Sequence, residues 1–138
     1  MEFRWFVLVL VTLFVWGTWG LVTRVASSAM GWRDTAAVAA IGHMLVALFF
    51  IVGSRAHVLP HGPVWIMALI AGSLGFIGAM TFYMALDLNP SSIVVVATSL
   101  YPLVTLALSF LLLGESITPR QAVGIALALT ALVLISSE

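Results

Sequence analysis

Five long apolar stretches, each bounded by polar or helix-breaking residues, constrain this chain more than any other feature. A helix needs about 20 mostly apolar residues to cross the hydrocarbon core of a bilayer, which is about 30 Å thick. Stretches of that length cover residues 5–28, 35–53, 63–86, 90–113 and 119–136. They predict an all-α integral membrane protein, with a bundle of five transmembrane helices in a single domain over residues 1–138.

Composition excludes several classes of function. Hydrophobic residues make up 63% of the chain and charged residues 7%, against about 45–50% and about 25% in soluble domains. The formal net charge is zero, so no basic surplus attracts nucleic acid, and we expect no nucleic-acid partner. The absence of cysteine excludes disulfides and thiol catalysis. No nucleophile–base pair or pair of carboxylates can be placed together from the sequence, so we expect no enzyme and no cofactor.

Local signals place the helix boundaries. Asn89 before Pro90 is typical of an N-cap followed by proline at the first helical position, and Gly62-Pro63 opens the third helix in the same way. Gln121 follows Thr118 by three residues, as a capping box requires. The predicted connections are short and cover residues 29–34, 54–62, 87–89 and 114–118.

The first stretch has some features of a cleavable signal peptide. Arg4 precedes it, and the small residues 26–28 follow its apolar part. Arg24 directly before this point, together with Trp16 and Trp19 inside the apolar part, favours a helix that is retained.

The loop arginines indicate orientation only weakly. With five spans the termini lie on opposite sides of the membrane, so Arg4, Arg55 and Arg120 fall on the N-terminal side. Arg24 and Arg33 fall on the other side, and Arg24 hardly counts if it lies within the first helix. The bias favours a cytoplasmic N-terminus but is small enough for insertion in both orientations.

Small residues on the third and fifth helices form surfaces for close helix packing. Ala71, Gly75 and Ala79 share one face of the third helix, and Gly124 and Ala128 form a shorter example on the fifth. Packing inside the monomer is the first interpretation, and contact with another subunit is the second.

Two ionisable residues are candidates for proton coupling. His43 lies near the middle of the second stretch, where a histidine either carries protons or stays neutral and hydrogen-bonded to a neighbouring helix. A single His without Asp, Glu or Cys companions predicts no metal site. Glu115 ends the fourth helix, where a carboxylate opposes the helix dipole. A structural pairing with Arg120 or with the next helix's N–H groups is the first interpretation for Glu115, and proton coupling is the alternative.

One face of the first helix combines aromatic and hydroxyl side chains. Spacings of four, three and four residues separate Thr12, Trp16, Trp19 and Thr23. This face is suited to lining a cavity for an amphipathic or flat solute, and the alternative is an interfacial aromatic belt. The depth of both tryptophans in the segment favours a cavity or the protein core. Tyr83, late in the third helix, is a weaker cavity candidate.

A second polar face lies on the fourth helix. Thr98, Pro102, Thr105 and Ser109 follow the same spacing, and Tyr101 flanks them. Pro102 cannot donate to the carbonyl of Thr98, so we expect a kink there. Irregular backbone at membrane depth is tolerated against protein or a wet cavity. The face therefore predicts part of a solute pathway, with a simple packing kink as the alternative.

The chain resembles the EamA domain of the drug/metabolite transporter superfamily. The resemblance rests on ATSLYPLVTLALSFLLLGE over residues 97–115, SITPRQ over 116–121 and Gly124. Trp16-Gly17 and residues 78–92 agree with it, and the similarity covers nearly the whole chain. Many members carry a lysine after the first-helix Trp-Gly where this chain has Arg24, so the resemblance implies a retained role for the cation but does not imply the substrate.

The resemblance implies an arrangement of two such units. Family members are commonly ten-helix proteins built from two inverted five-helix halves, and they move amino acids, metabolites or toxic compounds. A single unit would then need a second copy or a related partner, antiparallel around a central cavity. We expect a transporter of small organic solutes that works outward by alternating access in a bacterial or archaeal plasma membrane. The alternative is a non-transporting subunit that binds or stabilises a partner membrane protein.

Overall fold

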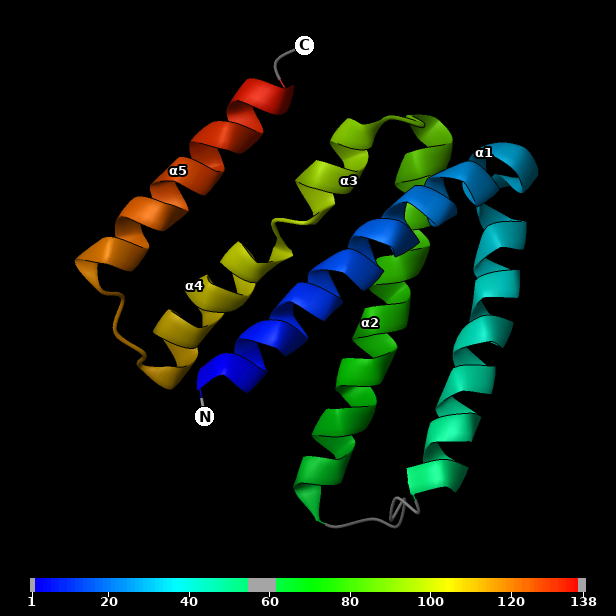
Figure 1. Ribbon diagram of the computed structural model, residues 1–138, viewed down its shortest axis with the longest axis horizontal. Coiled ribbons are helices and arrows are strands. Elements are labelled where there is room, and N and C mark those ends of the chain that lie inside the picture. Colours follow the sequence, from blue (N-terminus) through cyan, green and yellow to red (C-terminus); the bar gives the residue numbers. More distant parts are fainter. Residues whose placement is uncertain (1, 55–61, 137–138) are drawn as a thin grey trace. The chain divides into compact units, whose positions relative to one another are not determined.

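The computed structural model describes residues 2–54 and 62–136, and their ordered elements are all helical. The chain forms two compact units, Met1–Pro90 and Ser91–Glu138. The first unit holds α1 and α2, and the second holds α3 to α5 (Figure 1). The helices are α1 (Glu2–Ser54), α2 (Pro63–Leu88), α3 (Ser92–Thr98), α4 (Tyr101–Leu113) and α5 (Pro119–Ser136).

Helix α1 contains both of the first two predicted helices and is divided by one residue. Gly31 has non-helical angles, with φ 78° and ψ 165°. The chain reverses direction there, so residues 2–30 and 32–54 form two arms (Figure 1). The predicted loop over residues 29–34 is therefore wrong. Glycine lacks a Cβ and adopts positive φ at no steric cost, so a single residue makes the turn.

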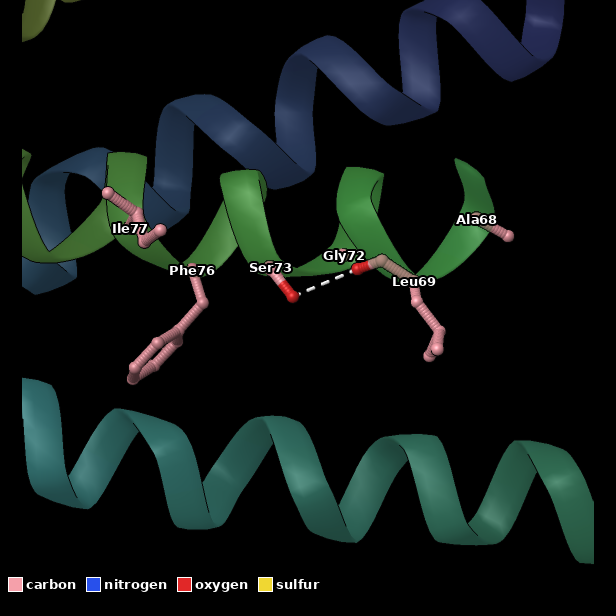
Figure 2. Close-up of a pocket in the computed structure, with 6 residues that line it drawn as sticks. All are labelled: Ala68, Leu69, Gly72, Ser73, Phe76 and Ile77. Atoms are coloured by element: carbon pink, nitrogen blue, oxygen red, sulfur yellow. Dashed lines mark hydrogen bonds between the residues drawn. The ribbon is translucent and has the colours of Figure 1, made fainter. Parts of the chain in front are cut away.

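Helix α2 lies between the two arms of α1, as both views show (Figures 1 and 2). It begins at Pro63 after Gly62, whose φ is 72°, and this confirms the predicted start. It continues to Leu88, two residues beyond the predicted end. The interpretation of Asn89 as an N-cap is wrong. Its N–H donates to the carbonyl of Ala85 at 2.9 Å, so Asn89 ends α2, in the extended conformation that a following proline favours.

The packed core of the first unit lies near the Gly31 turn. Short side chains from α1 meet larger ones from α2 there, and the buried residues are Gly20, Thr23, Ser27, Thr35, Ala36, Phe82, Tyr83 and Leu86. Most other apolar side chains of both arms are exposed. Exposed apolar surface of this extent is typical of segments that face lipid or a partner, because lipid is as apolar as leucine.

In the second unit, the predicted fourth helix is two helices. Ser99 and Leu100 form a turn between α3 and α4, and Pro102 occupies the first turn of α4. The predicted interruption before Pro102 is present, but it is a full break and not a kink in one helix. Helix α3 begins at Ser92 and not at Pro90. Helix α4 ends at Gly114, which has left-handed angles of φ 68° and ψ 21°.

Helix α5 has the predicted bounds and the predicted capping box. The backbone N–H of Gln121 donates to the Thr118 hydroxyl at 3.3 Å, and the N–H of Thr118 donates to Gln121 Oε1 at 2.8 Å. These two bonds satisfy two of the N–H groups that a helix start leaves without helical partners.

Three described segments are long and apolar enough to cross a membrane. They are Arg4–Ser54, Pro63–Leu88 and Ser92–Leu113, and Pro119–Ile135 is shorter. Each arm of the first segment exceeds the roughly 20 residues that a crossing requires. Arg55, which the orientation argument uses, and most of the predicted 54–62 connection lie outside the described residues. The count of five crossings remains a prediction.

Candidate functional site

Three of the residues predicted to line a cavity come together in the first unit. Trp19 of α1 lies against Tyr83 of α2, and Thr23, Ser27 and Phe82, which are buried, complete the group. These five residues are called the α1–α2 cluster below. Trp19 stacks on Phe82 with ring centroids 5.2 Å apart and planes 28° apart. Local helix geometry explains the convergence, because residues 19, 23 and 27 are four apart and share one face of α1.

The phenol of Tyr83 is the most deeply buried polar side chain of the cluster. The residue has no exposed surface, and its hydroxyl has no hydrogen-bond partner among the described residues. The ring of Trp19 lies 6.2 Å away between centroids, at 51°. Its indole acts on the hydroxyl electrostatically, but the pair does not meet hydrogen-bond geometry. A buried hydroxyl without a partner is costly, so this position is exceptional.

Side chains of α1 form hydrogen bonds with the C-terminal half of α2 and with the residues that follow it. The Ser27 hydroxyl donates to the backbone carbonyl of Tyr83 at 3.3 Å. Arg24 Nε donates to the carbonyl of Pro90 at 3.0 Å, beyond the end of α2. Arg24 is partly buried and shares a helix face with Gly20, Thr23 and Ser27, so a cation lies beside the cluster.

The other predicted residues of α1 lie outside the cluster. Trp16 is 55% exposed, one turn before the buried Gly20. His43 is exposed on the second arm, and its Nδ1 is 2.8 Å from the carbonyl of Ala39. A carbonyl only accepts, so Nδ1 carries the proton in this bond and Nε2 is left as the acceptor nitrogen.

The predicted residues of the second unit surround the break between α3 and α4. The Thr98 hydroxyl donates to the carbonyl of Val94 at 2.7 Å, within its own helix. Tyr101 and Pro102 are exposed in the first turn of α4. Glu115 is exposed directly after Gly114.

Two shallow hollows lie on the surface of the first unit, outside the cluster. One follows α2, has a volume of about 480 Å³ and is mainly apolar (Figure 2). Its lining residues are Ala68, Leu69, Gly72, Ser73, Phe76 and Ile77. The Ser73 hydroxyl donates to the carbonyl of Leu69 at 2.9 Å, so its polar group is satisfied within the helix (Figure 2).

The second hollow, of about 320 Å³, lies at the Gly31 turn between Trp32, Arg33, Asp34 and Asp87. The Arg33 guanidinium lies 5.4 Å from the centre of the Trp32 ring. Asp34 occupies the first turn of the second arm, where the helix dipole favours a carboxylate. A structural role in ending one arm and starting the next accounts for these charges. No group of three His, Asp or Glu able to hold a metal occurs among the described residues.

Ser27 and Phe82 belong to the cluster but are not among the site residues predicted from the sequence. A signal for Ser27 was available, since it continues the four-residue spacing from Trp19 through Thr23. Phe82 gave none, because a phenylalanine in an apolar helix is indistinguishable from its neighbours until the facing helix is known.

Comparison with known proteins agrees with the helical architecture. Residues 3–137 match the model of the EamA-like transporter family. A 69-residue stretch is 41% identical to an uncharacterized protein of Methanocaldococcus jannaschii, and this stretch covers half of this chain and half of that protein. No solved structure matches the chain. Because the family match covers almost every residue, the chain is an integral membrane protein that belongs to the EamA-like transporter family of the drug/metabolite transporter superfamily.

Proposed function

We propose that the protein transports small organic solutes outward across the membrane by alternating access, as an antiparallel dimer with a second copy or a related unit. Family membership supports transport as the class of activity. The observation that carries the proposal is the Tyr83 hydroxyl, fully buried and without a partner among the described residues. Inside a membrane each unsatisfied polar group costs several kcal/mol, so a polar group in this position favours a functional role over a packing role.

Solute contacts are proposed for aromatic and hydroxyl side chains of each unit taken by itself. Trp16, Trp19, Thr23 and Tyr83 supply aromatic and hydroxyl groups from the first unit. Thr98 and Tyr101 supply hydroxyl and aromatic groups from the second, next to Pro102. The break at Ser99 and Leu100 supports this role, because interrupted helices in transporters expose backbone groups to bound solutes. Pro102 acts as a flexible point at this break.

Proton coupling is assigned to His43, with Glu115 as a second carrier. The bond from His43 Nδ1 to the Ala39 carbonyl leaves Nε2 as a proton acceptor. Both side chains are exposed on the single chain, so neither is held in the packed core of its own unit.

Cysteine accessibility tests the proposed cavity. The chain has no native cysteine, so single substitutions Trp16→Cys, Thr98→Cys and Pro102→Cys report position by position in membranes. Reaction with a water-soluble maleimide is expected at all three. Ala107→Cys is the control, because residue 107 lies two positions from Thr105 and therefore on the opposite face of α4. Protection of all three cavity positions would contradict the proposal.

A second candidate is a non-transporting subunit, which the apolar hollow on α2 favours (Figure 2). At Gly72 and Gly75 an added Cβ would have nothing within 4 Å in the first unit. The small residues there do not pack against that unit, and a partner helix can approach closely. This candidate predicts protected cavity positions, together with transport that is absent from vesicles containing this chain alone.

A further inference from the structure

The donors and acceptors of the α1–α2 cluster restrict the chemistry of the solute. The Tyr83 oxygen can accept a hydrogen bond, and the indole of Trp19 is the neighbouring side chain that interacts with it. An indole N–H is a donor only, so this bond would leave the phenolic proton without an acceptor. The Ser27 hydroxyl already donates to the Tyr83 backbone. The O–H of Tyr83 therefore requires an acceptor that is not among its described neighbours.

The positive charge of Arg24 beside the cluster also favours a ligand group that accepts hydrogen bonds and is negatively charged. Arg24 shares the buried face of α1 with Thr23 and Ser27, and a guanidinium has five donors and no acceptor. Asp34 and Asp87 are exposed at the Gly31 turn. The cluster therefore offers hydrogen-bond donors to a ligand group, with the cation of Arg24 on the same helix face.

Trp19 is the most exposed member of the α1–α2 cluster. Tyr83 has no exposed surface and Phe82 is 6% exposed, whereas Trp19, which stacks on Phe82, is 37% exposed. Trp19 is therefore the member of the cluster that can rotate with the least loss of buried contact. Rotations of exposed side chains are fast, on the picosecond to nanosecond scale.

We infer that Tyr83 determines substrate specificity by donating its phenolic O–H to a carboxylate of the transported solute after Trp19 swings off Phe82. This inference rests on the proposed transport function and narrows its substrate class to carboxylate-bearing organic solutes. The same site discriminates against organic cations, whose ammonium group offers no acceptor and is repelled by Arg24.

Binding of matched probes to the purified full-length protein tests the inference. Benzoate, benzyl alcohol and benzylammonium share a ring and differ in the group presented to Tyr83. Calorimetry is expected to show tighter binding of benzoate than of benzylammonium. Tyr83→Phe deletes only the hydroxyl and is expected to weaken benzoate binding about 10- to 100-fold, the loss typical of a hydrogen bond to a charged group. It should leave benzylammonium binding unchanged. Ser73→Ala, which removes a satisfied hydroxyl on the same helix, is the control.

Three results would overturn the inference: equal benzoate affinity in wild type and Tyr83→Phe, preference for benzylammonium, or no binding of benzoate and of larger aryl carboxylates. Uptake of the same probes by vesicles separates this failure from failure of the transport proposal. If the vesicles transport benzylammonium but not benzoate, the carboxylate assignment is wrong and the transport proposal still stands. Benzoate binding that depends on Tyr83, without transport of any probe in either orientation, supports the recognition role and removes the transporter.

Discussion

The turn at Gly31 makes the substitution Gly31→Ala a sharp test of the fold. Its φ of 78° and ψ of 165° lie in a region that residues with a Cβ rarely occupy, and holding such a residue there costs about 1–3 kcal/mol. Crowding adds little, because an added Cβ would be 3.9 Å from Asp87 Oδ1, an ordinary contact. The lower entropy of the unfolded alanine chain offsets about 0.4–1 kcal/mol. We expect a net loss of about 1–2 kcal/mol in the free energy of unfolding.

Gly42→Ala is the matched control, since Gly42 lies in the second arm of the same helix. It is helical, and an added Cβ there meets nothing within 4 Å. Alanine is better than glycine inside a helix by about 0.5–1 kcal/mol, so this variant should be more stable than wild type. Reversible unfolding in mixed micelles of rising denaturing-detergent fraction measures both. The two substitutions are expected to change the free energy of unfolding in opposite directions. A Gly31→Ala protein as stable as Gly42→Ala would refute the positive-φ turn.

Three further predictions follow from single side chains. Thr118→Ala breaks the capping box and should lower stability by about 0.5–2 kcal/mol in the same unfolding assay; Thr130→Ala, whose hydroxyl binds only its own helix, should change it little. Tyr83→Phe removes a buried hydroxyl without a partner and should unfold no more readily than wild type, and a clear loss of stability would show that the hydroxyl is bonded. His43→Ala should abolish the pH dependence of transport in vesicles at constant expression, and an unchanged profile would remove the coupling role.

The predictions that succeeded depend on residues close together in the chain. The capping box at Thr118 and Gln121, the start at Gly62-Pro63 and the bounds of α5 are determined by contacts within about four residues. Backbone hydrogen bonds inside a membrane must be satisfied within the segment, so long apolar stretches become helices whatever surrounds them. The prediction that Asn89 is an N-cap was wrong because an asparagine at this position can either start one helix or end another. The choice depended on how far α2 extends, which its packing against α1 decides.

For the candidate site, too, the features that follow from local spacing were predicted and those that depend on the facing helix were not. Helical spacing alone grouped Trp19 with Thr23 on one face, and Tyr83 was identified only as a polar residue at membrane depth. The sequence determined the class of fold, the helix ends with strong local signals and the residue types available for solute binding, because these follow from hydrophobicity and from contacts near in sequence. Only the tertiary structure decided that one residue, Gly31, makes the reversal predicted over residues 29–34, and that Tyr83 lies against Trp19 with its hydroxyl buried and without a partner among the described residues. Burial and hydrogen bonding of a side chain depend on the facing helix, which lies more than 50 residues away along the chain.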